Sequence, residues 1–431
     1  MFSLLIYRLL ILLLLPLLVL ALLLRSLSHK QYRQRLNERL GFFPEPYIKG
    51  GIVVHAASVG EVIALTPFVE QLLANYPNQA VTITTFTPTG AEQVKKTFGN
   101  RVQHGFLPLD IFPCTQLFLS RLQPKLVIFM ETELWPNLIA QCRSKKIKLL
   151  LINGRLSANS MKSYQKINAL MTPALNRFDK ILCQSRDNYE NFLQLGADPN
   201  RCEVSGNLKF DLSVNQATTD KTIQLQKLLP DNRTIWLVAS THEGDEAITL
   251  NAFKKIKTLF PQLLLVLVPR HPERFKQVAN LCLNHHFSLV KRSEALSVIE
   301  QDIWLLDTLG ELMAAFSLAD IVTMGGSFSH IGGHNPLEPA LFKKAIIVGN
   351  NMSNFTEIMQ QLQQNNGIVQ LSTPTASDDS EQSQALASAV TSLLKNQQQM
   401  KVLGEQAHQV VMANQGASAR TLAEVKVLID D

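Results

Sequence analysis

Carboxylates follow two apolar runs in the first half of the chain, where they could act as acids or bases. Glu61 closes the motif Ser58–Glu61 soon after the run Ile52–Ala56, and the segment Glu131–Glu133 directly follows the run Leu126–Met130. If each run is a buried strand, its carboxyl end is where ligands bind in a parallel sheet. A carboxylate there could take a proton from a substrate hydroxyl, as a general base must. We therefore expect Glu61 to face a ligand site.

Both groups of carboxylates also have purely structural explanations. The S-x-x-E spacing is that of a capping box, in which Glu61 would stabilise a helix start by about 1 kcal/mol or less. Glu131 and Glu133 could be solvated loop residues. If the strand continues through them, they would instead point the same way, opposite to Thr132, and both could face a ligand. Lys209 could counter negative charge in a site, or it could be an ordinary solvated lysine.

A glycine-rich stretch in the second half, residues 324–342, has the pattern of an anion site. The apolar run Asp320–Met324 precedes two glycine pairs. Asn335 then predicts a helix N-cap, with Pro336 in the first turn and Glu338 three residues after the cap. Free backbone N–H groups and the positive end of a helix dipole would point at the loop. The alternative is an ordinary capping box beside a loop.

Two further segments of the second half carry groups suited to a nucleotide. Pro269 and Arg270 follow the apolar run Leu263–Val268, and a guanidinium fixed by the preceding proline suits a phosphate. Gly310–Leu312 lies at a predicted helix start, where backbone N–H groups could bind the edge of a nucleobase. These segments extend the predicted anion site to a site for a nucleotide.

Alternating apolar runs and helical patterns must position these groups. Helical patterns such as Val62–Asn75 separate strand-like runs, and this alternation is typical of α/β proteins with doubly wound parallel sheets. We predict two such halves hinged near residue 210, with ligands in the cleft between them. The predicted strands are Ile52–Ala56, Val81–Thr85, Leu126–Met130, Lys148–Ile152, Lys180–Gln184, Ile235–Ala239, Leu263–Val268, Phe287–Val290, Ile303–Leu306, Ile321–Met324, Ala345–Val348 and Gly367–Gln370.

The N-terminal segment, residues 1–24, is almost wholly apolar. Arg8 is its only charged side chain and Pro16 lies in its middle, and crossing a bilayer takes roughly 20 residues. No small-x-small cleavage site follows, which argues against a signal peptide. The basic flank that comes next predicts that the rest of the chain is cytoplasmic. We expect an uncleaved membrane anchor that either spans the bilayer or lies in its interface.

Composition narrows the classes of function. The chain has 431 residues, 46% of them hydrophobic, and a net charge of +6, which suits two domains and a partner that is nucleic acid, anionic lipid or a phosphorylated substrate. Its five cysteines are scattered, without a C-x-x-C pair, which argues against a disulfide framework and a structural zinc site. Asp378 and Asp379 fall in a polar segment and no D-x-D motif lies at a strand end, so we expect metal-independent chemistry.

The motifs, taken as a set, resemble one enzyme family. SVGE, ETELWPN, INGRLS, SGNLKFD, THEGDE, PRH, GELM and GGHNPLEP occur in this order behind the apolar N-terminus. Together they resemble the bacterial 3-deoxy-D-manno-octulosonic acid (Kdo) transferases. The resemblance implies a GT-B glycosyltransferase fold with an N-terminal anchor at residues 1–30, an acceptor domain at 31–210 and a donor domain at 211–431, the last two Rossmann-like. It also implies a place on the cytoplasmic side of the bacterial inner membrane.

The resemblance further implies a reaction and its residues. The reaction is an inverting transfer of Kdo from CMP-Kdo to the lipid A precursor lipid IVA, with no cofactor and no nucleic-acid partner. By resemblance, Glu61 is the catalytic base, and Glu131 and Lys209 stabilise the transition state. The CMP-binding residues that it implies are Pro269, Arg270, Gly310, Glu311, Leu312, Asn335, Pro336, Leu337 and Glu338. One, two or more Kdo residues per acceptor are compatible with the same site.

Two alternatives to this function remain at the level of the sequence. One is a different GT-B enzyme that uses a UDP-sugar on a lipid carrier, and binding of UDP rather than CMP would favour it. The other is a non-enzymatic, membrane-tethered nucleotide-binding protein. Such a protein would need the nucleotide site without the base, so Glu61→Gln would leave its function intact.

Overall fold

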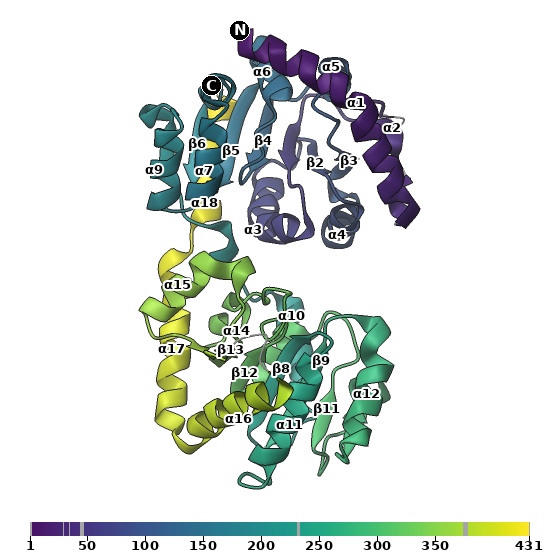
Figure 1. Ribbon diagram of the computed structural model, residues 1–431, viewed down its shortest axis with the longest axis vertical. Coiled ribbons are helices and arrows are strands. Elements are labelled where there is room, and N and C mark those ends of the chain that lie inside the picture. Colours follow the sequence, from purple (N-terminus) through teal and green to yellow (C-terminus); the bar gives the residue numbers. More distant parts are fainter. Residues whose placement is uncertain are drawn as a thin grey trace. The chain divides into compact units, whose positions relative to one another are not determined.

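The strands of this protein are buried almost throughout, as parallel sheets covered by helices on both faces require. The computed structural model describes residues 2–28, 30–33, 35–43, 47–230, 233–373 and 378–430. The chain forms two units (Figure 1): unit 1 comprises Met1–Asp211 and Asn414–Asp431, and unit 2 comprises Leu212–Ala413. Each unit contains one seven-stranded sheet in which every pair of neighbouring strands is parallel. The predicted α/β class with two doubly wound sheets is confirmed.

The sheet of unit 1 has the strand order β3-β2-β1-β4-β5-β6-β7. The sequence does not predict β3 and β7, because QHGF and CEV contain no apolar run and both strands lie at an edge of the sheet. The other five strands lie where the apolar runs predict them. The strands are β1 (Ile52–His55), β2 (Val81–Thr85), β3 (Gln103–Phe106), β4 (Leu126–Met130), β5 (Lys148–Gly154), β6 (Lys180–Cys183) and β7 (Cys202–Val204).

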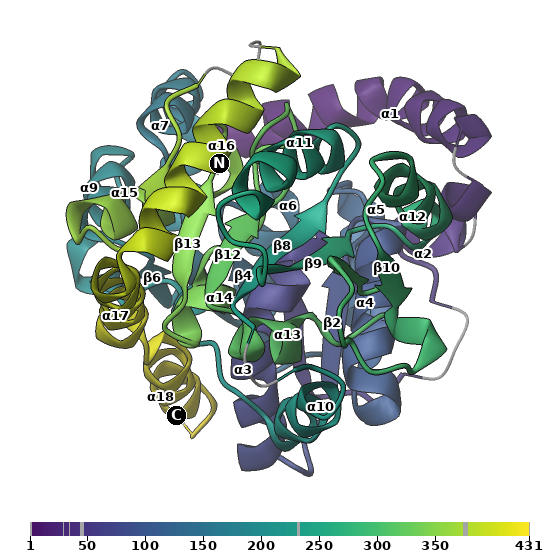
Figure 2. The ribbon, with the colours of Figure 1, turned by 90° about the horizontal axis from the view of Figure 1, so that it is seen from below.

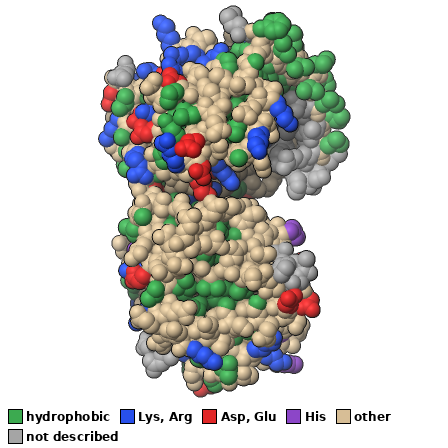
Figure 3. Space-filling view, turned by 60° about the vertical axis from the view of Figure 1, so that its left-hand side comes forward, with side chains coloured by type: hydrophobic (Ala, Val, Ile, Leu, Met, Phe, Trp, Pro, Cys, Tyr) green, Lys and Arg blue, Asp and Glu red, His purple; other side chains and the backbone are tan. Residues whose placement is uncertain are grey.

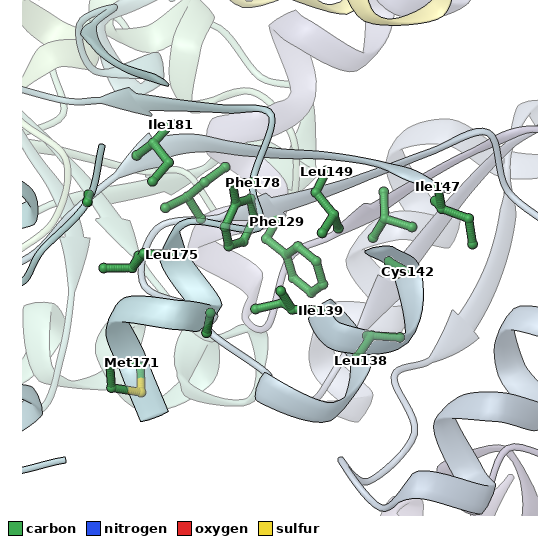
Figure 4. Close-up of a cluster of buried hydrophobic side chains, with 14 of the residues drawn as sticks. Phe129, Leu138, Ile139, Cys142, Ile147, Leu149, Met171, Leu175, Phe178 and Ile181 are labelled. Carbon is green, nitrogen blue, oxygen red and sulfur yellow. The ribbon is translucent and has the colours of Figure 1, made fainter. Parts of the chain in front are cut away.

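Helices cover both faces of the first sheet. On one face, α3, α4 and α18 pack with alternate strand residues such as Val54 and Ile128. On the other face, α5, α6, α8 and α9 pack around Phe129 and Phe178, as the close-up in Figure 4 shows for part of this core. The helices of unit 1 are α1 (Phe2–Ser28), α2 (Leu36–Arg39), α3 (Val59–Asn75), α4 (Pro88–Phe98), α5 (Phe112–Leu122), α6 (Pro136–Ser144), α7 (Ala158–Gln165), α8 (Asn168–Leu175), α9 (Arg186–Gln194) and α18 (Ala417–Asp430).

The sheet of unit 2 has the order β10-β11-β9-β8-β12-β13-β14. All seven strands overlap the predicted runs. They are β8 (Ile235–Thr241), β9 (Leu264–Pro269), β10 (Leu289–Lys291), β11 (Ile303–Leu305), β12 (Ile321–Met324), β13 (Ala345–Val348) and β14 (Val369–Gln370).

The helices of unit 2 also lie on both faces of its sheet. In Figure 2, α11, α12 and α16 lie on one face of the strands and α10, α13 and α14 on the other, and the first three share a core with Trp236 and Leu265. The helices are α10 (Gln216–Gln226), α11 (Asp245–Lys257), α12 (Phe275–Asn284), α13 (Leu312–Leu318), α14 (Leu337–Leu341), α15 (Thr356–Gln364), α16 (Asp379–Lys395) and α17 (Gln397–Asn414).

The last helix, α18, returns to unit 1, whereas the predicted donor domain, 211–431, includes it. Leu422 and Val425 of α18 pack in the core that contains Val54 and Ile128. Asp211 accepts hydrogen bonds from the backbone N–H groups of Gly416, at 2.6 Å, and Ser418. The apolar face of α18 is visible in the sequence, but the sheet that it covers is not.

The N-terminal helix α1 lies against unit 1. Ser3 Oγ donates to the carbonyl oxygen of Ala169 at 2.7 Å, Tyr7 donates to Asp110 at 2.9 Å and Arg8 Nε donates to Asn137 at 2.8 Å. Among the described residues, no helix has both the length and the apolar content that a bilayer crossing requires. The sequence predicts an anchor at residues 1–30 that spans the bilayer or lies in its interface, and the structure has the helix Phe2–Ser28 in this segment, with its polar groups bonded to the folded unit.

Candidate active site

The predicted carboxylates lie at the topological switch point of the first sheet. Strands β1 and β4 are neighbours, and the chain runs outward from this pair in opposite directions along the sheet. Glu61 lies in the first turn of α3, which follows β1, and Glu131 and Glu133 follow β4. Ligands of doubly wound sheets bind at this point, outside the carboxyl ends of the strands. The sheet order therefore supports a ligand site at Glu61.

Glu61 caps α3, much as the S-x-x-E spacing predicts. Ser58 Oγ accepts from the Glu61 N–H at 3.4 Å and donates to Glu61 Oε1 at 2.8 Å, while Glu61 Oε2 accepts from the Ala57 N–H at 2.9 Å. Burial raises the pKa of Glu61, as do the charges of Glu131 and Glu133, whereas the two hydrogen bonds lower it; the net direction is upward. A higher pKa makes the carboxylate a stronger base, so its capping role and a role as base are compatible.

Glu131 and Lys209 come together from different segments of unit 1. Lys209 Nζ lies 3.7 Å from Glu131 Oε1, with side chains 23% and 19% exposed. Glu131 has a φ of 58°, a left-handed conformation that costs a non-glycine residue about 1–2 kcal/mol. The interpretation of Glu131–Glu133 as a continued strand is wrong, because β4 ends at Met130 and the chain turns at Glu131.

A second switch point, between β8 and β12, organises unit 2. Asp245 Oδ2, at the start of α11, accepts from the backbone N–H groups of His242 at 2.8 Å and Gly326 at 2.7 Å, and so ties the loops after the two strands together. Gly325 allows the two loops to come this close, since a Cβ at this position would lie 2.6 Å from the carbonyl oxygen of Ser240. The glycine pair predicted to build a loop does so.

Arg270 follows this edge of the sheet with its side chain exposed. Pro269 ends β9, and the Arg270 N–H donates to the carbonyl oxygen of Thr241 at 3.0 Å. No hydrogen bond or ion pair engages the Arg270 side chain within the part of the chain that the structure describes. Its charge acts on the groups around it, because it lowers the pKa values of His334 and Glu338. The structure thus places Arg270 near the 335–338 segment.

The helix predicted to start at Asn335 has its N-cap one residue later, at Pro336, and is short. Helix α14 begins at Leu337 and has 5 residues, so its dipole is small. Asn335 Oδ1 accepts from the Leu337 N–H at 3.2 Å, and Asn335 Nδ2 lies 3.5 Å from Glu338 Oε1. Burial raises the pKa of Glu338 to about 7, against the lowering effects of Asn335 and Arg270. Anion binding here would depend on Arg270 rather than on the helix.

The Gly310–Leu312 segment lies at the start of α13, which packs against α14. Glu311 is buried and is already engaged, because it accepts from Arg292 at 2.9 Å and from Thr308. The carbonyl oxygen of Gly310 accepts from Lys221 at 2.7 Å. The predicted site residues of unit 2 therefore lie on neighbouring connections, and Pro336 and Leu337 among them are buried.

Comparisons with known proteins identify the family. Residues 34–212 match the model of the family described as 3-deoxy-D-manno-octulosonic-acid transferase (kdotransferase). The chain is 41% identical over 413 residues to the 3-deoxy-D-manno-octulosonic acid transferase of Haemophilus influenzae. This match covers 94% of each chain. The chain belongs to the Kdo transferase family.

Other comparisons agree with this assignment. A Kdo transferase of Rickettsia prowazekii is 36% identical over 375 residues, or 86% of this chain and 78% of that protein. Among solved structures, the UDP-GlcNAc 2-epimerase of Neisseria meningitidis has a TM-score of 0.58 at 14% identity, over 87% of this chain and 99% of the other. That likeness concerns the fold alone, which is GT-B-like. The Kdo transferase prediction and the glycosyltransferase activity that it carries are confirmed.

Near the predicted site residues, two pairs of side chains meet in a way that the sequence does not show. His242 Nε2 lies 2.8 Å from His334 Nε2, and burial, with the charge of Arg270, lowers the pKa of His334 to about 4. In unit 1, the buried His55 and the half-buried Glu133 lie side by side, with Nε2 3.5 Å from Oε2. Each pair comes from segments of two neighbouring strands, β8 and β12 or β1 and β4, so which residues meet depends on the order of the strands, which the sequence does not show.

Proposed function

We propose that this Kdo transferase moves Kdo from CMP-Kdo to the lipid A precursor lipid IVA, with inversion at the anomeric carbon. The observation that carries the proposal is the group Glu61, Glu131 and Lys209 at the switch point of unit 1, in a chain of this family. The Lys209–Glu131 distance of 3.7 Å and the upward shift of the Glu61 pKa support it. Unit 1 would take the acceptor and unit 2 the donor.

In this reaction Glu61 takes the proton of the acceptor hydroxyl. The hydroxyl oxygen forms a bond to the anomeric carbon of Kdo, and the bond from that carbon to the phosphate oxygen of CMP breaks. The Ser58 and Ala57 contacts hold the carboxylate in one orientation and leave lone pairs on both oxygens for the substrate. Lys209, held by Glu131, would stabilise negative charge that develops during transfer.

CMP would bind at the switch point of unit 2. The exposed guanidinium of Arg270 is suited to the phosphate, because it can donate two parallel hydrogen bonds. Glu338 would accept hydrogen bonds from the ribose hydroxyls, and Gly310–Leu312 would lie along the base. CMP leaves with a single phosphate, so one arginine can neutralise much of the charge and the proposed chemistry needs no metal.

We also propose that the protein works at the cytoplasmic face of the bacterial inner membrane, with α1 in the interface rather than across the bilayer. One side of α1 bonds to unit 1, whereas Leu9, Leu13 and Leu17 are exposed, at 61%, 77% and 61%. Hydrophobic side chains gather along one edge of the first unit in Figure 3. A helix with one exposed apolar side is suited to the boundary between headgroups and acyl chains. Flotation with phospholipid vesicles tests this, and Leu9→Glu/Leu13→Glu should abolish it.

The reaction is tested by a transfer assay with CMP-Kdo and lipid IVA. Glu61→Gln should lower the product rate by about 100-fold or more, since general-base catalysis contributes about that much. The glutamine can still accept from the Ala57 N–H, so the helix start should persist. Glu70→Gln is the matched control, because Glu70 lies on the same helix in an exposed ion pair with Arg101. Equal rates for wild type and Glu61→Gln would refute the base, and transfer from a UDP-sugar alone would refute the donor.

A further inference from the structure

We propose that Glu133, with the stacked rings of Trp135 and Phe86, binds the acceptor sugar beside Glu61. The inference rests on the proposed function and names a part of unit 1 that would recognise the acceptor. The ligand class is a saccharide that presents hydroxyl or amide N–H groups to a carboxylate and an apolar C–H face to a ring. Glu133 would be a binding and positioning residue and would not exchange a proton with the substrate.

The Glu133 carboxylate is held at one oxygen and open at the other. Trp135 Nε1 donates to Glu133 Oε2 at 2.8 Å, and His55 Nε2 lies 3.5 Å from the same oxygen. The other oxygen, Oε1, has no hydrogen-bond partner in the described part of the chain, and the side chain is 26% exposed. A carboxylate fixed through one oxygen can present the other to a ligand without losing its orientation.

His55 supplies a second, independent sign of a ligand site. Its side chain is fully buried, and Nδ1 lies 3.0 Å from Thr84 Oγ1 and 3.1 Å from the Thr84 carbonyl oxygen, so these contacts hold the ring in place. Nε2 has no hydrogen-bond partner within range and points at Glu133, 3.5 Å away. Ordinary N–H···O bonds are about 2.7–3.2 Å long. A small shift of Glu133 upon sugar binding would close this contact, as often happens when a site tightens around its ligand.

The two aromatic rings lie on the same edge of the sheet. Phe86 follows β2 and Trp135 follows β4, on either side of β1, and their ring centroids are 6.0 Å apart with planes 20° from parallel. Both rings are half-buried. Arg39 fixes Phe86, because it donates to the Phe86 carbonyl oxygen at 2.8 Å and lies over the ring at 5.1 Å. A rigid, partly exposed ring beside a carboxylate matches the two kinds of surface that a sugar presents.

Charge favours the hydrogen-bond donors of a sugar, rather than its acidic groups, as the ligands of Glu133. Burial alone would raise the pKa of Glu133, but the neighbouring His55 ring and the hydrogen bond from Trp135 lower it overall, so the group is anionic at neutral pH. An anionic Glu133 repels carboxylates and phosphates, so the acidic groups of either substrate would lie away from this site. Hydroxyl and amide N–H groups of the acceptor sugar are hydrogen-bond donors, which the open oxygen attracts.

Intrinsic fluorescence offers a binding assay that does not depend on catalysis. Of the three tryptophans, Trp236 and Trp304 are buried in unit 2, and Trp135 is half-buried in the proposed site. Lipid IVA in detergent micelles, titrated into the full-length protein, should change the emission of Trp135. Trp135→Phe keeps a ring but removes both the signal and the N–H donor, which identifies the reporting residue.

The test compares wild type, Glu133→Gln and the control Glu70→Gln in this titration and in the transfer assay. We expect Glu133→Gln to raise the acceptor Kd and KM about tenfold and to leave the KM for CMP-Kdo within about twofold, while Glu70→Gln matches wild type. An unchanged acceptor Kd and KM in Glu133→Gln overturns the inference, even if transfer itself is confirmed. Saturable binding weakened in Glu133→Gln, without transfer by wild type, would keep the inference and overturn the proposed reaction.

Discussion

Glu338 should make the stability of unit 2 depend on pH. Its pKa is raised from 4.5 to about 7 by burial, so the folded state disfavours the ionised form. A carboxylate with a raised folded pKa imposes no penalty below pH 4.5, where it is protonated in both states. As pH rises from about 4.5 to about 7, the unfolded chain loses this proton while the folded chain keeps it, so stability falls, and above about 7 the loss is complete.

The magnitude follows from that difference in pKa. At about 1.4 kcal/mol per pH unit, a rise from 4.5 to about 7 corresponds to about 3.5 kcal/mol at most. The side chain is only half-buried by its surface area, so solvent screens part of the effect. We expect Glu338→Gln to stabilise unit 2 by about 1 to 3 kcal/mol at pH 8 and by less than about 1 kcal/mol at pH 5.

Urea unfolding in a Trp135→Phe background measures this difference. The remaining tryptophans, Trp236 and Trp304, are buried in unit 2 and report its unfolding. The exposed Glu405, paired with Lys343 at 3.1 Å, provides the control Glu405→Gln. His334 and Asp245 also titrate between pH 4 and 7, but they are common to all variants and cancel in the comparison.

The same substitution should harm nucleotide binding. If Glu338 accepts from the ribose hydroxyls, replacing an ionised acceptor by a neutral one should weaken CMP binding about fivefold at pH 8. A stability difference between Glu338→Gln and wild type that is the same at pH 5 and pH 8 would refute the reasoning about burial. Unchanged CMP affinity would refute the ribose contact alone.

Three further predictions follow from other parts of the molecule. Transfer activity should be unaffected by excess EDTA, and its loss, restored by a divalent cation, would refute metal-independent chemistry. Gly325→Ala should weaken CMP binding and lower the free energy of unfolding by about 1–3 kcal/mol in urea, since the new Cβ would lie 2.6 Å from the Ser240 carbonyl oxygen. An unchanged free energy of unfolding would show that the loop moves to accommodate the methyl group. Asp211→Ala should destabilise unit 1 by about 1–2 kcal/mol through loss of the α18 cap, whereas Asp211→Asn should lose less.

The sequence predicts most strands because a strand buried on both faces must be apolar. β12 and β13 are found at the predicted residues for this reason. β3 is not predicted because it lies at the edge of the sheet, where its first two residues are only half-buried, and its sequence QHGF has no apolar run. The packing of α18 on the first sheet is not predicted, because an apolar helix face carries no information about which sheet it covers.

The site was predicted where local pattern suffices and missed where contacts cross strands. The Ser58–Glu61 spacing predicts a capped helix, and the structure shows one. His55 and Glu133 meet because β1 and β4 are neighbours, and this order is invisible in the alternation of strand and helix patterns. The chain also turns at Glu131, where the backbone is left-handed. The alternation of side chains along a strand therefore does not predict the directions of Glu131 and Glu133.

The return of α18 means that unit 2 is an insertion within unit 1. The chain leaves unit 1 after Asp211 and re-enters at Asn414, and Asp211 bonds to Gly416, so exit and entry are neighbours. Residues 212–413 could therefore be replaced by a short glycine-rich linker without separating the two ends. The shortened chain would keep the complete core of the first sheet, whereas a chain that simply stopped at residue 211 would leave that core exposed where Leu422 and Val425 belong.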